Sequence, residues 1–196
     1  MYQEKIKNYK QSDKNEFDLG FNSQRLAYIP DYFSSYLNKS KLPNFTLLVS
    51  RDNQIVHLSS QGVASVEDGT ELNHDSIYRI FSMTKPITST AIMMLYEKGL
   101  LRLEHEVSRY LPEFKNIKVW DGGDVENYNV REPSQPILIK DLLTHTSGMT
   151  YGFMLGHPVI KLYNTSGIAS AKNPETKKEM NLTEFSNTAA SLPLTF

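Results

Sequence analysis

The chain has 196 residues, a net charge of −1 at neutral pH and no cysteine. A charge this close to zero argues against nucleic acid or an anionic membrane surface as a partner, and the lack of cysteine excludes disulfides, thiol nucleophiles and thiolate metal sites. No segment is apolar over the length of a bilayer, and residues 1–10 lack the apolar core of a signal peptide, so we expect a cytoplasmic protein. The length of the chain allows one hydrophobic core.

A polar segment opens the chain, and a predicted helix follows it. Residues 1–19 offer little to bury, so we expect them to be flexible, and we expect residues 20–196 to form one folded domain. Ser23 stands where it can cap a helix that runs to about Leu37. The residues expected on the inner side of this helix are Leu26, Ile29, Tyr32, Phe33 and Leu37.

Two alternating segments predict a β-hairpin after this helix. Residues 45–50 and 54–59 are rich in residues that favour strands, and Arg51-Asp52-Asn53 between them favours a tight turn. We expect this hairpin to supply the first two strands of an antiparallel sheet.

Ser82 lies three residues before Lys85, at the start of the next predicted helix. Pro86 suits a first helical turn and Gly99 a position just past the last, which places Ser82 at the N-terminus of the helix. Because residues three apart share a helix face, the Lys85 amine is expected beside the Ser82 hydroxyl, where it can take the proton and so activate the serine. Backbone N–H groups and the helix dipole favour a developing oxyanion there. The stripe expected to be buried and to fix the helix comprises Ile87, Ala91, Met94 and Leu95.

The region after this helix predicts a loop and offers no metal site. Gly, Asp, Asn and Pro are dense between Trp120 and Pro136, which is typical of a surface loop. Residues 121–124 resemble a calcium loop only in part, because the remaining oxygen ligands and the closing Glu are missing. The five histidines are scattered without ligand spacing. We therefore expect no metal site.

His145 and the aromatic residues beyond it have two interpretations each. Asp141 lies one turn before His145 and suggests a catalytic dyad, but no Gly-x-Ser-x-Gly turn accompanies it, so a structural histidine is favoured. Tyr151 and Phe153 flank a glycine after a Ser-Gly turn. They either line a substrate cleft or pack as ordinary aromatic residues.

Four segments together resemble one enzyme superfamily. They are residues 78–86, 91–103, 107–114 and 139–153. In this order they are similar to the penicillin-recognising serine hydrolases, and the last segment most resembles the branch of class C β-lactamases, DD-peptidases and family VIII esterases. The resemblance covers about residues 20–196. It implies a mixed α/β fold of the β-lactamase and transpeptidase type, an antiparallel sheet flanked by helices, which is incomplete in this chain.

The resemblance also implies roles for individual residues. Ser82 matches the acylated nucleophile, its backbone N–H matches one donor of the oxyanion hole, and Lys85 matches the general-base partner. Phe81 and Tyr151 are candidates for the substrate cleft. The implied partner is a small-molecule ester or β-lactam, and no cofactor is implied.

Two further motifs of the superfamily are not found after Ser82. One is a tyrosine followed two residues later by Ser or Asn, and the other is Lys-Thr-Gly or His-x-Gly. Tyr36 and Asn38 match the first pattern but precede the serine, and Tyr163-Asn164 fits no better. We therefore expect the N-terminal portion of a longer enzyme, inactive by itself.

An esterase is the favoured function. Relatives that act on cell-wall peptides are exported, and no export signal is visible at the start of this chain. The alternative within the superfamily is β-lactamase or DD-peptidase activity. The hypothesis of another class is a truncated, non-catalytic fragment or a binding module.

Overall fold

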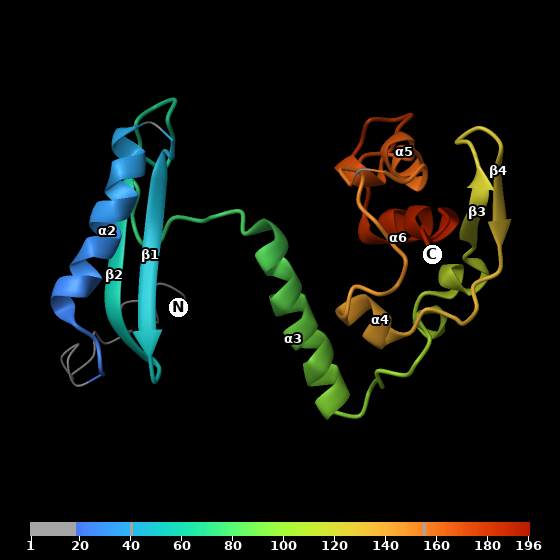
Figure 1. The fold of residues 1–196 in the computed structure, drawn as a ribbon, viewed down its shortest axis with the longest axis horizontal. Helices are drawn as coiled ribbons and strands as arrows, with labels where there is room; N and C mark the ends of the chain where they lie inside the picture. Colours follow the sequence, from blue (N-terminus) through green and yellow to red (C-terminus); the bar gives the residue numbers. More distant parts are fainter. Residues whose placement is uncertain (1–18, 40, 155) are drawn as a thin grey trace. The chain divides into compact units, whose positions relative to one another are not determined.

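The computed structural model describes residues 19–39, 41–154 and 156–196. The chain divides into two compact units, residues 1–80 and 81–196, and each is described by itself. Over the described residues, the first unit contains one helix and a two-stranded sheet, and the second combines helices with another two-stranded sheet (Figure 1). Within the described ranges, every helix is too short or too polar to serve as a membrane span.

The predicted hairpin is confirmed in the first unit. Strands β1 (Asn44–Arg51) and β2 (Gln54–Gly62) pair antiparallel. The turn between them consists of Asp52 and Asn53, which both have positive φ, at 52° and 58°. Two such residues in succession match the right-handed twist of the strands, and Asp and Asn tolerate this conformation best after glycine.

Helix α2 (Ser23–Asn38) covers one face of this hairpin, with a cap one residue earlier than predicted. The Asn22 side chain accepts a hydrogen bond from the Arg25 N–H at 3.0 Å, so Asn22 is the cap and Ser23 is the first helical residue. The prediction that Tyr32 faces inward is wrong. Its side chain is 60% exposed, because its hydroxyl bonds to that of Tyr36 one turn later, along the solvent side of the helix.

A small core joins the helix to the hairpin. It is built from Leu19, Leu26 and Val56, and Phe21, Ile29 and Val49 pack around it. A β-bulge leaves Val56 between two strand pairs and turns its side chain into this core. Leu19 is thus a packed residue, and the rest of the segment expected to be flexible lies outside the described residues.

The observed cap gives a direct test of how α2 begins. We expect Asn22→Ala to lower the free energy of unfolding by about 1 kcal/mol, because the Arg25 N–H loses its acceptor. Ser23→Ala is the matched control and should leave stability unchanged. Urea denaturation followed by circular dichroism measures both. A larger loss for Ser23→Ala would return the cap to the predicted position.

The second unit begins with a helical segment, and its other elements follow in chain order. A 3₁₀-helix (Phe81–Met83) runs directly into α3 (Thr84–Glu97). Two further 3₁₀-helices, Val107–Arg109 and Pro112–Asn116, lead to strands β3 (Val119–Gly123) and β4 (Tyr128–Arg131). The remaining elements are α4 (Ile139–Leu143), α5 (Val159–Thr165), the 3₁₀-helix Ile168–Ser170 and α6 (Leu182–Ser191).

Residues from both ends of this stretch form one core. Val107, Val119 and Val159 are its most deeply buried side chains. The other members are Phe114, Ile117, Ile137, Tyr163, Ile168, Ala189, Leu192 and Leu194. Leu194 also forms a parallel bridge with Val119, which ties the last residues of the chain to β3.

The loop predicted between Trp120 and Pro136 is wrong as far as Arg131, because β3 and β4 form a hairpin there. Trp120 packs against the core and stacks on Tyr128, with ring centroids 5.0 Å apart and an angle of 18° between the rings. The Asp124 carboxylate accepts the N–H groups of residues 126 and 127. The polar residues that indicated a loop therefore make the turn and the exposed strand of a hairpin.

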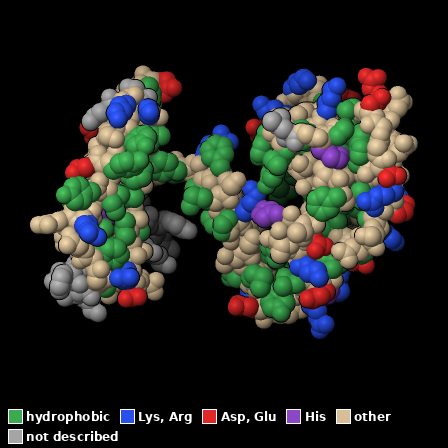
Figure 2. All heavy atoms as spheres, viewed as in Figure 1, with side chains coloured by type: hydrophobic (Ala, Val, Ile, Leu, Met, Phe, Trp, Pro, Cys, Tyr) green, Lys and Arg blue, Asp and Glu red, His purple; other side chains and the backbone are tan. Residues whose placement is uncertain are grey.

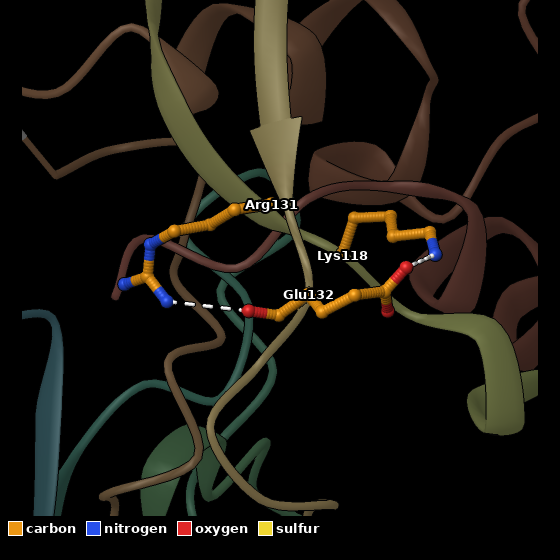
Figure 3. A network of polar contacts seen from close by, with 3 residues as sticks. All are labelled: Lys118, Arg131 and Glu132. Atoms are coloured by element: carbon orange, nitrogen blue, oxygen red, sulfur yellow. Dashed lines mark hydrogen bonds and ion pairs between the residues drawn. The ribbon is translucent and has the colours of Figure 1, made fainter.

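Charged side chains make contacts at the surface of this hairpin, at the end opposite its turn. Lys118 donates to the Glu132 carboxylate, and Arg131 donates to the Glu132 backbone carbonyl at 3.3 Å (Figure 3). Arg131 also lies 3.8 Å from the Asp121 carboxylate. All these side chains are exposed to solvent, so each contact adds at most about 1 kcal/mol to stability.

The buried stripe predicted on α3 is also wrong. None of the residues of α3 is buried, and Ile87 and Met94 are 61% and 52% exposed. Figure 2 shows hydrophobic side chains at the surface over this helix. The helical periodicity correctly predicted the helix, but a periodic stripe does not identify the element that covers it.

Candidate active site

Ser82 and Lys85 lie together at the start of α3, as their spacing predicts. Ser82 is the middle residue of the 3₁₀ turn that leads into the helix, and Lys85 is in the first turn of α3. The Lys85 Nζ donates to the Ser82 Oγ at 3.1 Å. The Ser82 side chain is exposed and Lys85 is half-buried. A substrate can therefore reach the hydroxyl, and the amine beside it is within range for proton transfer.

The backbone changes direction sharply at the residue before the serine. Phe81 has a φ of 45°, in the left-handed region that costs a non-glycine residue about 1–2 kcal/mol. Its ring is exposed, as expected of a residue that lines a cleft, although its role there stays a prediction. Strained backbone of this kind clusters at functional sites. It persists there because the surrounding structure holds the residue in place.

The N-terminus of α3 suits an oxyanion. In the part of the chain that the structure describes, no side chain caps this helix at Met83. The first N–H groups of a helix have no partner within it, and the positive end of the helix dipole adds to their field. The N–H of Ser82 belongs to this turn. Its role as an oxyanion donor remains a prediction that this setting supports.

Tyr151 lies beside the same lysine. The Lys85 Nζ is 5.4 Å from the centroid of the Tyr151 ring, within the range of a cation–π contact. Tyr151 also stacks on Phe153, with centroids 4.9 Å apart. Their side chains are 42% and 76% exposed, so neither is a packed core residue. The sequence predicted Tyr151 as a cleft residue but gave no signal for its contact with Lys85.

The suggested pair of Asp141 and His145 has a structural explanation. The Asp141 carboxylate accepts the Leu138 N–H at 2.9 Å and so closes the first turn of α4. His145 follows that helix with an exposed side chain and a φ of 60°. The bond to the Leu138 N–H gives the Asp141 carboxylate a structural role.

The Ser-Gly turn after His145 joins the last residues of the chain. The Gly148 carbonyl accepts both the N–H and the hydroxyl of Thr195, at 2.8 and 2.9 Å. Gly148 has a φ of 78°, and a Cβ there would lie 2.7 Å from the Phe196 carbonyl oxygen. Only glycine fits this close approach, which explains why residue 148 is a glycine.

The two tyrosines weighed for the missing motif have other partners. The Tyr163 hydroxyl accepts the Thr150 N–H at 3.4 Å, and burial raises the pKa of Tyr163. The Tyr36 hydroxyl pairs with that of Tyr32 at 2.8 Å. Among the described residues, no three acidic, histidine or cysteine side chains gather closely enough to hold a metal ion.

Comparison with known proteins identifies related chains. The beta-lactamase family model matches residues 29–184. Esterase EstB of Burkholderia gladioli is 32% identical over 171 residues, which are 87% of this chain and 39% of the esterase. An uncharacterized protein of Mycobacterium tuberculosis is 34% identical over 116 residues, 59% of this chain and 29% of that protein.

Solved structures show the same fold. EstCE1, described as a hydrolase with promiscuous acyltransferase activity, matches with a TM-score of 0.72 and 24% identity. The match covers 88% of this chain and 42% of that one. The chain thus spans about two fifths of the length of EstB and of EstCE1.

Proposed function

The chain belongs to the beta-lactamase family, and from this premise we propose that the full-length protein containing these residues is a serine hydrolase that cleaves small carboxylic esters. The observation that carries the proposal is the 3.1 Å contact between the Lys85 Nζ and the Ser82 Oγ at the N-terminus of α3. The similarity to an esterase over 87% of the chain favours an ester as the substrate class.

The proposed reaction proceeds through an acyl-enzyme. Lys85 in its neutral form takes the proton of Ser82 while the serine oxygen attacks the ester carbonyl carbon. The carbonyl oxygen becomes an oxyanion, which the Ser82 N–H stabilises. The protonated Lys85 then gives this proton to the leaving alcohol oxygen as the carbon–oxygen bond breaks, and the acyl group stays on the serine oxygen. Water attacks this second ester, releases the carboxylic acid and restores the hydroxyl.

A substrate panel tests the ester proposal. We expect the full-length protein to hydrolyse p-nitrophenyl acetate and butyrate, and to open a chromogenic cephalosporin more slowly. Spectrophotometric rates at equal protein concentration measure both reactions, and Ser82→Ala serves as the blank. Faster β-lactam opening would replace the ester proposal with a β-lactamase. Rates equal to those of the Ser82→Ala blank on every substrate would favour a non-catalytic binding module.

A further inference from the structure

The backbone on both sides of Tyr151 is bonded to two consecutive residues of α5. The N–H of Thr150 donates to the Tyr163 hydroxyl at 3.4 Å. The side-chain amide of Asn164 donates to the Gly152 carbonyl at 2.9 Å. Tyr151 therefore lies between two points that are attached to the same helical turn.

This attachment is rigid on the side of the helix. Tyr163 is only 4% exposed and belongs to the core of the second unit. At Gly152 the chain also passes very close to α5 and to the 3₁₀-helix after it, because a Cβ there would lie 2.5 Å from both the Asn164 Oδ1 and the Ala169 Cβ. The position of the Tyr151 backbone is thus set by packed residues, although Tyr151 itself is partly exposed.

The Tyr151 ring in turn contacts the lysine of the site. The Lys85 Nζ lies 3.1 Å from the Ser82 Oγ and 5.4 Å from the Tyr151 ring centroid. Phe153 stacks on Tyr151 with an angle of 24° between the rings and restricts its rotation. An aromatic face attracts an ammonium group but cannot accept its proton. It can therefore keep the Lys85 amine beside Ser82 and favour the ammonium that forms when the amine takes the serine proton.

From these contacts we propose that Tyr151 is a positioning residue for Lys85, and that Tyr163 and Asn164 of α5 set the place of its ring. The proposal rests on the proposed function, since it assigns Lys85 as the base of Ser82. It gives the ring face the positioning role and leaves none for the Tyr151 hydroxyl. Tyr163 and Asn164 fit no motif in the sequence. Their proposed role is to hold the backbone on either side of Tyr151.

Two substitutions separate the ring from its hydroxyl. In the full-length protein, Tyr151→Leu should slow labelling of Ser82 by a fluorophosphonate probe roughly 10- to 100-fold, the scale of loss when a catalytic group shifts by about 1 Å. Tyr151→Phe keeps the ring face and should label within about twofold of the parent protein. A Tyr151→Phe variant as slow as Tyr151→Leu would overturn the proposal in favour of the hydroxyl.

Steady-state kinetics separate positioning from substrate binding. With p-nitrophenyl acetate, Tyr151→Leu should lower kcat and leave KM within about threefold of the parent value, because the loss lies in the reaction step. A raised KM with an unchanged kcat would instead make Tyr151 a wall of the substrate cleft and would overturn the positioning role.

A variant on α5 tests the attachment itself. Asn164→Asp keeps the size of the side chain but removes the N–H donor to the Gly152 carbonyl, so labelling of Ser82 should slow by roughly 3- to 10-fold, as expected when one hydrogen bond that positions a group is lost. Lys161→Ala, an exposed change on the same helix, should label at the parent rate. Equal rates for Asn164→Asp and Lys161→Ala would contradict the role of α5.

The parent protein distinguishes failure of this inference from failure of the proposed function. If the probe does not label Ser82 in the parent, the serine hydrolase proposal fails, and the positioning role fails with it. If the parent is labelled at Ser82 and Tyr151→Leu is labelled equally fast, only the positioning role fails. Thermal melting of each variant shows whether a slower rate reflects a lost fold, and Asn164→Asp then decides independently of Tyr151→Leu.

Discussion

Replacing Ser82 with alanine should abolish acyl-enzyme formation in the full-length protein. The variant lacks the oxygen that attacks the ester, so kcat should fall on the order of a millionfold, the scale seen when a serine nucleophile is removed. Mass spectrometry of the protein after reaction with a fluorophosphonate measures the covalent adduct directly. The adduct should map to Ser82 in the parent and be missing from the variant.

A second serine of the same unit provides the control for this result. Ser191 is exposed near the end of α6, and its hydroxyl bonds to the Thr188 carbonyl within the helix. Ser191→Ala should therefore label as the parent does. An adduct that persists in Ser82→Ala would place the nucleophile on another residue and would contradict the site described here.

Replacing Lys85 should slow acylation by several orders of magnitude, with the fold intact. Lys85→Ala removes the group that takes the serine proton, and a general base contributes about 10²- to 10⁴-fold to the rate. Lys85→Arg should lose nearly as much, because a guanidinium group keeps its proton. Arginine can still contact an aromatic ring, so this second variant separates proton transfer from simple positive charge.

Rates of Ser82 acylation, measured in a single turnover, check this prediction. Lys98→Ala is the matched control, because Lys98 is an exposed lysine at the other end of the same helix. It should acylate at the parent rate. If Lys85→Arg retained the parent rate, the lysine would act as a charge and another residue would have to be the base.

Local elements of this fold follow from short stretches of sequence. The hairpin of β1 and β2 depends on alternation and on two turn residues, Asp52 and Asn53, so the sequence predicts it. The pairing of Ser82 with Lys85 depends only on spacing along a helical segment, and it too was predicted. Both cases involve neighbours within a few residues of each other.

Features that depend on distant residues were predicted wrongly or not at all. The segment that forms β3 and β4 was predicted to be a loop because its sequence is polar. The packing of Trp120 against core residues far along the chain cannot be read from that local sequence. The contact of Tyr151 with Lys85 was not predicted, since it depends on how α5 holds the intervening chain. The apolar stripe on α3 shows the same limit, because periodicity indicates a helix but does not indicate which element packs against it.

The core of the second unit has a consequence for the order of events during synthesis. Val107 and Val119 complete their packing only when Leu192 and Leu194 are available, because all four belong to one core. The core of the first unit needs nothing beyond β2, which ends at Gly62. A growing chain can therefore close its first unit early, whereas the second cannot complete its core until Leu194 has been synthesised. Until then the apolar side of β3 is open to nascent neighbours, which makes this interval the period of greatest risk for aggregation.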